Sequence, residues 1–226
     1  MLTAAPEEQR PAARRGMYIL PSLFTCGNIA AGFYSFVEAI HASAGHDPQG
    51  FDRAALAILF AIVFDGLDGR IARMTNTSSA FGKELDSLAD VITFGVAPSL
   101  LAYLWGVQQV VPWASAAFDA RVANLGSVIC FLFLICGACR LARFNISVNP
   151  QPRNPGRPDR KYFVGMPIPA GAGVVAAVVH FESGSPIHSG WLCLLWLGLI
   201  AFVGFLMVSS WRFWSCLLYT SPSPRD

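Results

Sequence analysis

Four aspartates between residues 65 and 90 are the side chains of this sequence best suited to chemistry. Asp65 pairs with Asp68, and Asp86 with Asp90, in the stretch DGLDGRIARMTNTSSAFGKELDSLAD. Spacings of three and four residues place both members of a pair on one helix face, so two neighbouring helices would bring four carboxylates together. Such carboxylates repel one another unless a cation lies between them. Carboxylate oxygens suit Mg²⁺ or Mn²⁺, and the stretch contains no His or Cys, so we predict a hard divalent cation there.

The residues between the aspartates suit an anionic ligand held against that cation. Gly66, Gly69 and Gly82 lack side chains, so a ligand could approach the backbone closely. Arg73 supplies a guanidinium whose donors match phosphate oxygens. The alternative, that the aspartates are only paired structural charges, is disfavoured because clustered ionisable groups are costly in a membrane.

Composition predicts a polytopic membrane protein with an all-α fold. Hydrophobic residues make up 54% of the chain and charged residues only 13%, with a mean hydropathy of +0.49, which lies outside the range of soluble domains. Apolar stretches long enough to cross about 30 Å of hydrocarbon predict a bundle of about six transmembrane helices. They cover approximately residues 18–40, 53–74, 84–106, 123–143, 165–181 and 190–210.

The aspartates lie where the second and third apolar stretches meet. Asp65 and Asp68 fall in the last turns of the second stretch, and Asp86 and Asp90 in the first turns of the third. A short polar linker separates the two stretches. Both pairs are therefore expected near one face of the membrane.

The first apolar stretch carries a polar stripe. Pro21, Thr25 and Asn28 recur at helical spacing, so one face of this helix is expected to turn inward. The stripe could face a substrate, or it could form helix-to-helix hydrogen bonds, which Thr and Asn commonly make in membranes.

Basic residues predict the orientation of the bundle. Most of the 16 Lys and Arg residues lie in the N-terminal arm, around the acidic stretch and after the fourth apolar stretch. The positive-inside rule then places the N-terminus and the aspartates on the cytoplasmic side. We expect the membrane to be a prokaryotic cytoplasmic (inner) membrane.

The two ends of the chain differ from the apolar region between them. Residues 1–17 form a polar arm that we expect in the cytoplasm, and residues 18–214 form the membrane domain. Residues 215–226, SCLLYTSPSPRD, resemble read-through into cloning-vector sequence, so we expect a non-native tail and a longer natural protein.

The six cysteines predict no disulfide framework, because most lie within apolar stretches. Cys136 and Cys139 form a C-x2-C pair, but they lie inside a predicted membrane helix with no second ligand pair beside them. A redox or metal site there is disfavoured.

The acidic stretch is similar to the signature of the CDP-alcohol phosphatidyltransferase family. That signature, D-x2-D-G-x2-A-R-x8-G-x3-D-x3-D, matches residues 65–90 at every fixed position and without a gap. The resemblance implies transfer of a phosphatidyl group from CDP-diacylglycerol to an alcohol, with release of CMP.

The resemblance also implies roles for individual residues. Asp65, Asp68 and Asp86 would ligate a two-metal site of Mg²⁺ or Mn²⁺, and Asp90 would complete it and act as the catalytic base. The residues expected to bind CDP-diacylglycerol are Gly69, Ala72, Arg73 and Gly82, together with Thr25 and Asn28.

Four further passages resemble the phosphatidylserine synthases of that family. They are LPSLFTCGN (20–28), DSLADVITFGVAP (86–98), RLARFN (140–145) and FVGMPIPA (163–170). They imply L-serine as the acceptor, and Arg140 and Arg143 could bind its carboxylate or a lipid phosphate. Alternatively, these arginines only anchor a helix end at the lipid headgroups.

The resemblance leaves rival functions open. Another enzyme of the family, such as a phosphatidylglycerophosphate or phosphatidylcholine synthase, would share the acidic signature. A cation transporter would also use intramembrane carboxylates, although nearer the bilayer midplane. The expected partners are CDP-diacylglycerol, L-serine, membrane lipids and a second copy of the chain in a homodimer, and no nucleic acid is expected.

Overall fold

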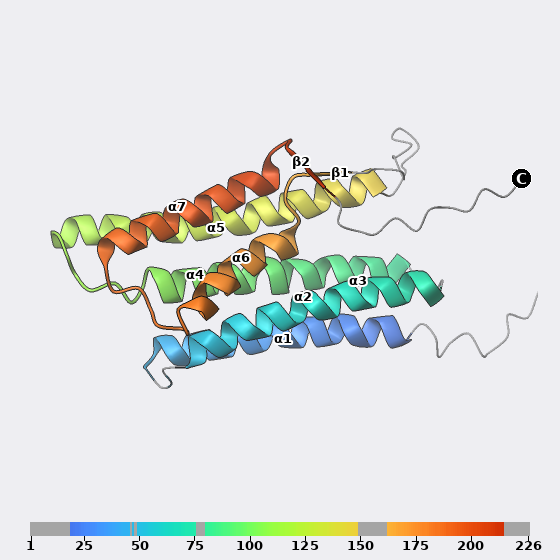
Figure 1. Ribbon diagram of the computed structural model, residues 1–226, viewed down its shortest axis with the longest axis horizontal. Helices are drawn as coiled ribbons and strands as arrows, with labels where there is room; N and C mark the ends of the chain where they lie inside the picture. The colour runs from blue at the N-terminus through green and yellow to red at the C-terminus, as the bar shows by residue number, and fades with distance from the viewer. Residues whose placement is uncertain (1–18, 46, 48, 76–79, 149–161, 215–226) are drawn as a thin grey trace, which may run out of the picture.

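The computed structural model describes residues 19–45, 47, 49–75, 80–148 and 162–214 as a helical bundle (Figure 1). The predicted N-terminal arm and the predicted tail therefore lie outside the described residues. The helices are α1 (Ile19–Ser43), α2 (Gly50–Thr75), α3 (Ala80–Asp90), the π-helix η3 (Val91–Val96), α4 (Ala97–Gly106), α5 (Ala116–Val148), α6 (Ile168–Phe181) and α7 (Gly190–Val208). In Figure 1, α1, α2 and the α3–η3–α4 segment form one group, α5 and α7 form another, and α6 lies between them.

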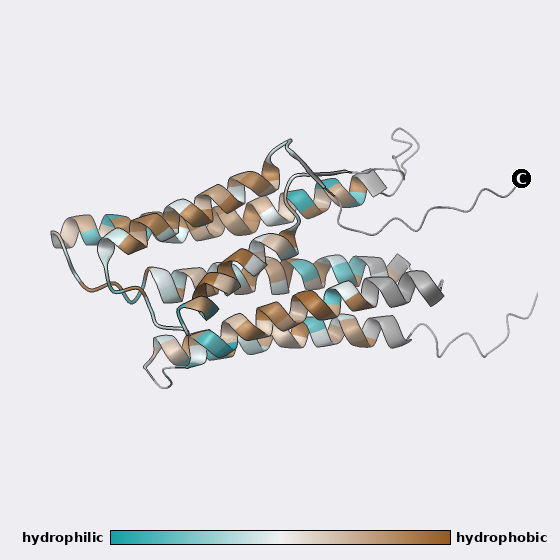
Figure 2. Cartoon of the chain, viewed as in Figure 1, coloured by the Kyte–Doolittle hydropathy of each residue, from teal (hydrophilic) through white to brown (hydrophobic). Residues whose placement is uncertain are grey.

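Length and composition confirm the predicted membrane bundle. Helical segments at Leu23–Ser43, Glu84–Gly106, Ala116–Ile146 and Gly190–Val208 are long and apolar enough to cross a membrane, and α6 is a shorter apolar helix. Figure 2 shows that hydrophobic residues, coloured brown, predominate along the middle of the helices. α2 occupies the second predicted stretch but carries charged residues at both ends, which lowers its mean hydropathy. The all-α prediction is confirmed.

The fourth membrane helix starts earlier than its sequence predicts. The sequence predicts a loop over residues 107–122, whereas α5 begins at Ala116. The hydroxyl Oγ of Ser115 accepts a hydrogen bond from the backbone N–H of Phe118 at 3.3 Å, as an N-cap residue does. α5 also continues past the predicted end at Arg143 to Val148, so the fourth predicted helix is longer at both ends.

A short antiparallel strand pair was not predicted. β1 (Tyr162–Val164) pairs with β2 (Arg212–Trp214) just before α6 and just after α7. Gly165 follows β1 with φ +80°, a conformation that favours glycine, and its N–H donates to the carbonyl of Trp211 at 3.0 Å. α6 therefore begins at Ile168, after this turn, rather than at the predicted residue 165.

The π-helix η3 lies directly after Asp90 and makes the third predicted stretch continuous. Pro98 follows it in the first turn of α4, where its ring clashes with the carbonyl four residues earlier in regular α-helical geometry. The wider turn of η3 accommodates this, and Ser99 Oγ donates to the carbonyl of Gly95 at 2.7 Å. The proline thus gives a local reason for the π-turn beside the aspartates.

Small side chains let α1, α2 and η3 approach closely, as is usual between membrane helices. An added Cβ at Gly32 would lie 2.8 Å from Thr93 Oγ1, so α1 and η3 are in direct contact. On α2, the fully buried residues Ala54, Ile58 and Ala61 face the core. Asp65 lies one turn beyond Ala61 on the same face of α2, so this packing directs it toward the interior.

Ion pairs hold the other end of the bundle. Arg53 Nη2 lies 2.6 Å from Glu38 Oε2 and also bonds Asp47, which joins α1, α2 and the turn between them. The hydrogen bond from Arg53 lowers the pKa of the Asp47 carboxyl below its usual value. His180 Nδ1 on α6 lies 2.6 Å from Asp52 Oδ1 on α2. These contacts fix α2 against α1 and α6.

Candidate active site

Three of the four predicted aspartates come together at one end of the bundle. α2 supplies Asp65, and α3 supplies Asp86 and Asp90, and one carboxylate oxygen of each lies within 4.8 Å of the others. All three residues are half-buried. These residues form a compact carboxylate cluster between α2 and α3, two helices that follow one another in the chain.

Several predicted site residues lie outside the described side chains. They are Asp68, Gly69, Ala72 and Arg73, all in the last part of α2, so their roles stay predictions. Gly82 is described: it is half-buried and lies one turn before Asp86 on α3. Among the described residues, nothing lies within 4 Å of a Cβ added at Gly66, beside Asp65.

The polar stripe of α1 faces inward. Thr25 is 5% exposed and Asn28 is fully buried. Thr93 Oγ1, one turn after Asp90, donates to the backbone carbonyl of Asn28 at 3.0 Å, so a helix-to-helix bond exists but does not use the Asn28 amide. Within the part of the chain that the structure describes, that amide is buried and has no hydrogen-bond partner. A buried amide in this state is suited to binding a polar ligand.

The two arginines at the end of α5 diverge. Arg140 is only 7% exposed, attracts Asp90 electrostatically and stacks over the ring of Phe144 at 5.2 Å. Arg143 is exposed, and its Nη1 donates to the carbonyl of Val208 at the end of α7, at 3.3 Å. Arg140 thus lies beside the carboxylate cluster, whereas Arg143 joins α5 to α7.

Sequence reasoning missed one contact at the site. Asn145 Nδ2 on α5 donates to Ser87 Oγ on α3 at 2.8 Å. Ser87 lies next to Asp86 in the acidic stretch, and Asn145 ends the RLARFN passage. A signal was present, because both residues lie inside passages already singled out, but pairing residues so far apart in the chain requires the fold.

The family model for CDP-alcohol phosphatidyltransferases matches residues 18–213, which include every helix described above. The acidic cluster falls inside this match.

The chain belongs to the CDP-alcohol phosphatidyltransferase family.

Curated relatives agree with this assignment. A protein of Helicobacter pylori J99 is 39% identical over 197 residues, covering 87% of this chain and 72% of its own length. A Saccharomyces cerevisiae protein is 38% identical over 150 residues, covering 66% and 49%, and one from Methanocaldococcus jannaschii is 36% identical over 156 residues, covering 69% and 61%. All three are named CDP-diacylglycerol–serine O-phosphatidyltransferase. The prediction of the family is confirmed, and a cation transporter is no longer a competing function.

The carboxylate cluster of this phosphatidyltransferase fits a divalent cation. Two unit charges about 4 Å apart repel by about 4 kcal/mol at an effective dielectric constant near 20, and three carboxylates make three such pairs. A hard cation would reverse that repulsion, and the three oxygen donors match the ligand preference of Mg²⁺ or Mn²⁺. The described residues can therefore hold a metal ion at this point.

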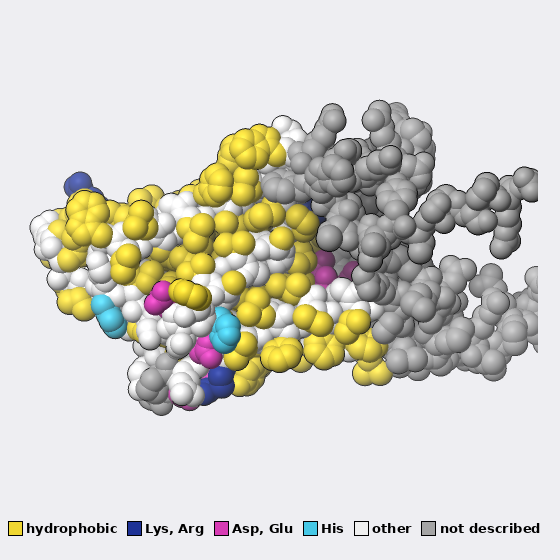
Figure 3. Space-filling model, viewed as in Figure 1, with side chains coloured by type: hydrophobic (Ala, Val, Ile, Leu, Met, Phe, Trp, Pro, Cys, Tyr) yellow, Lys and Arg dark blue, Asp and Glu magenta, His cyan; other side chains and the backbone are white. Residues whose placement is uncertain are grey.

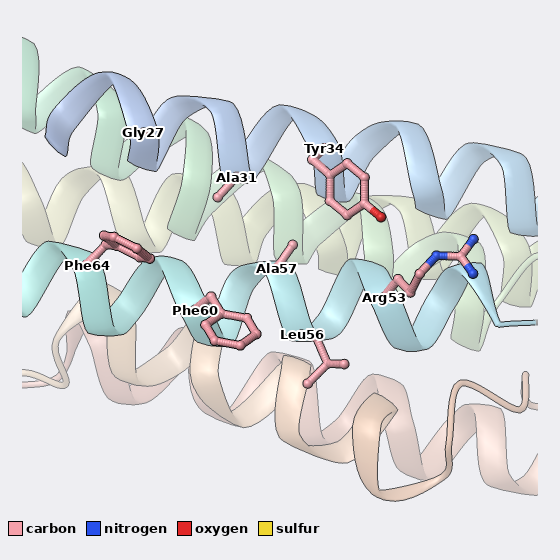
Figure 4. Close-up of a pocket in the computed structure, with 8 residues that line it drawn as sticks. All are labelled: Gly27, Ala31, Tyr34, Arg53, Leu56, Ala57, Phe60 and Phe64. Carbon is pink, nitrogen blue, oxygen red and sulfur yellow. The ribbon is translucent and has the colours of Figure 1, made fainter. Parts of the chain in front are cut away.

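An apolar groove of this phosphatidyltransferase lies between α1 and α2 (Figure 4). It encloses about 410 Å³, and Tyr34 and Arg53 form its polar end. Its other lining residues are Gly27, Ala31, Leu56, Ala57, Phe60 and Phe64. Figure 3 shows that apolar side chains dominate the visible face of the molecule and that charged groups occupy only a few places on it. None of the three clustered aspartates lines the groove, so the site is defined by the carboxylates rather than by this hollow.

Proposed function

We propose that this protein transfers the phosphatidyl group of CDP-diacylglycerol to L-serine, giving phosphatidylserine and CMP. The observation that carries the chemistry is the convergence of Asp65, Asp86 and Asp90 beside buried Arg140. The names of the relatives, which are 36–40% identical, support serine as the acceptor.

The carboxylates would hold the metal that the family signature implies. Asp65, Asp86 and Asp90, with Asp68 as the predicted fourth ligand, would bind two Mg²⁺ or Mn²⁺ ions. When bound, these ions supply positive charge that neutralises the diphosphate of the donor and the departing CMP.

The chain's own residues would bind the donor and position its diphosphate. Arg73 is the predicted phosphate ligand, and Gly69, Ala72 and Gly82 leave room for the nucleotide. The buried amide of Asn28, with Thr25 one turn before it, offers polar groups to the donor from α1. These contacts would hold the phosphorus atom in line with the incoming hydroxyl.

The acceptor would react in a single displacement at the phosphorus of the phosphatidyl group. The serine hydroxyl oxygen forms the new P–O bond, the bond to the CMP oxygen breaks, and CMP leaves with the electron pair. Asp90 accepts the hydroxyl proton as general base. The burial of the Arg140 guanidinium beside Asp90 supports a role for it in binding the serine carboxylate.

The same proposal includes the setting of the enzyme. The distribution of Lys and Arg supports an active site on the cytoplasmic side of a prokaryotic cytoplasmic membrane. A protease-accessibility assay in sealed inner-membrane vesicles would test that orientation. We also propose a homodimer, which chemical crosslinking in native membranes would test.

CMP release by the purified protein tests the function. CDP-diacylglycerol is supplied with L-serine, glycerol 3-phosphate or choline, with and without a chelator of divalent cations. We expect release that depends on L-serine and stops with the chelator. Release stimulated only by glycerol 3-phosphate would move the assignment to another member of the family, and chelator-insensitive release would contradict the metal site.

A further inference from the structure

We propose that the hydrogen bond between Asn145 and Ser87 is a positioning contact that sets the acceptor site against the carboxylate cluster. This inference rests on the proposed function, because it assigns the serine-binding side of the site to α5. It concerns two residues that are not expected to touch either substrate.

On α3, Ser87 lies between two members of the cluster. It follows Asp86 directly and precedes Asp90 by three residues on α3, so a segment bonded to Ser87 is held at a fixed position relative to both carboxylates. Ser87 is half-buried, and its hydroxyl accepts the hydrogen bond from Asn145 Nδ2 at 2.8 Å. This length is typical of a well-formed hydrogen bond.

On α5, Asn145 lies about one and a half turns beyond Arg140, the side chain that we place at the serine carboxylate. Arg140 is packed over Phe144, which immediately precedes Asn145. On another side of the same helix end, Arg143 bonds the last turn of α7. The end of α5 is therefore held by α7 on one side and by α3 on the other.

This arrangement divides the site into two parts. α2 and α3 carry the carboxylates that would bind the donor's diphosphate, whereas α5 carries the arginine that would bind the acceptor. The Asn145–Ser87 bond links these parts through two side chains. Its loss would let the end of α5 shift relative to α3, which would misplace Arg140 while leaving the carboxylates together.

If the contact positions the acceptor site, its loss should change the KM for L-serine but not the KM for CDP-diacylglycerol. Asn145→Ala and Ser87→Ala should each raise the KM for L-serine by about fivefold to tenfold, the equivalent of one hydrogen bond, while the KM for CDP-diacylglycerol changes by less than about twofold. The effects of the two substitutions should be less than additive in the double variant, because both remove the same bond. Ser87→Thr keeps the hydroxyl and should retain the wild-type KM for L-serine.

Ser43→Ala is the matched control. Ser43 Oγ bonds Gln108 Oε1 at 2.9 Å, which is also a long-range contact between side chains, but it lies at the other end of the bundle. This variant should change thermal stability about as much as Ser87→Ala does and leave both KM values unchanged.

Three results would overturn the inference: equal increases in both KM values, additive effects in the double variant, or a loss of thermal stability with unchanged kinetics. Failure of the proposed function has a different signature, because the wild-type protein would then prefer another alcohol. The variants are tested with that alcohol in such a case. A selective rise in its KM would support the positioning contact, and an unchanged KM would overturn it.

Discussion

The carboxylates at the two ends of α2 have different neighbours. At the first end, Asp52 lies against His180, and Arg53 lies against Glu38 and Asp47, so each of these carboxylates has a basic partner. About 20 Å further along the helix, Asp65 instead meets two more carboxylates. Pairs of opposite charges stabilise the packing of one helix against another. A cluster of like charges in the same bundle is stabilised when a cation binds to it, which is why the second end is the candidate active site.

The largest expected effect comes from removing one carboxylate of the cluster. Asp86→Asn should lower the rate of CMP release on the order of 10³-fold, since a metal ligand contributes several kcal/mol to stabilising the transition state. Folding stability in metal-free buffer should not fall, because a repulsive charge is removed. The comparison variant, Asp52→Asn, should keep most of the activity. Similar losses of activity in both variants would contradict the assignment of the active site to the clustered end of α2 rather than to the ion-paired end.

The next largest effect is a difference between the two arginines of α5 in the KM for L-serine. Arg140→Lys should raise the KM for L-serine by about tenfold or more, because an ammonium cannot replace the two-point contact of a guanidinium with a carboxylate. Arg143→Lys should change that KM by less than about twofold, since Arg143 bonds α7 instead. Serine-dependent kinetics at saturating CDP-diacylglycerol measure both values. A larger effect at Arg143 would reverse the assignment.

A smaller effect tests the buried amide of α1. Asn28→Leu should raise the KM for CDP-diacylglycerol by about fivefold, which is the loss of one hydrogen bond to a ligand. Its Tm without substrate should stay the same or rise, because the amide has no partner within the described part of the chain. A fall in Tm with unchanged KM would show that Asn28 is a structural residue.

The smallest effect belongs to the paired end. Glu38→Gln removes a carboxylate that is largely shielded from solvent and bound to Arg53. It should lower the Tm by a few degrees and leave both KM values unchanged, because ion pairs at a helix end contribute little and lie far from the site. Thermal unfolding followed by circular dichroism in detergent gives the Tm. A change in either KM would indicate coupling between the two ends.

Sequence alone predicted the helices and the acidic cluster because both depend on local periodicity. Long apolar stretches predict membrane helices, and spacings of three and four residues predict which aspartates lie on the same helix face. The different contacts of Arg140 and Arg143 were not predictable. Residues three apart on a helix differ in direction by tens of degrees, and their contacts depend on how the neighbouring helices pack. The β1–β2 pair, the early start of α5 and the Asn145–Ser87 bond likewise depend on contacts between distant segments.

Binding of Mn²⁺ to the purified protein, followed by electron paramagnetic resonance, tests the central claim without relying on turnover. The wild-type protein should bind Mn²⁺ saturably, and Asp86→Asn should weaken that binding by about tenfold or more, because one oxygen ligand is lost. Asp52→Asn should bind Mn²⁺ as the wild type does. Equal Mn²⁺ affinity in the wild type and in Asp86→Asn would contradict a metal site formed by Asp65, Asp86 and Asp90.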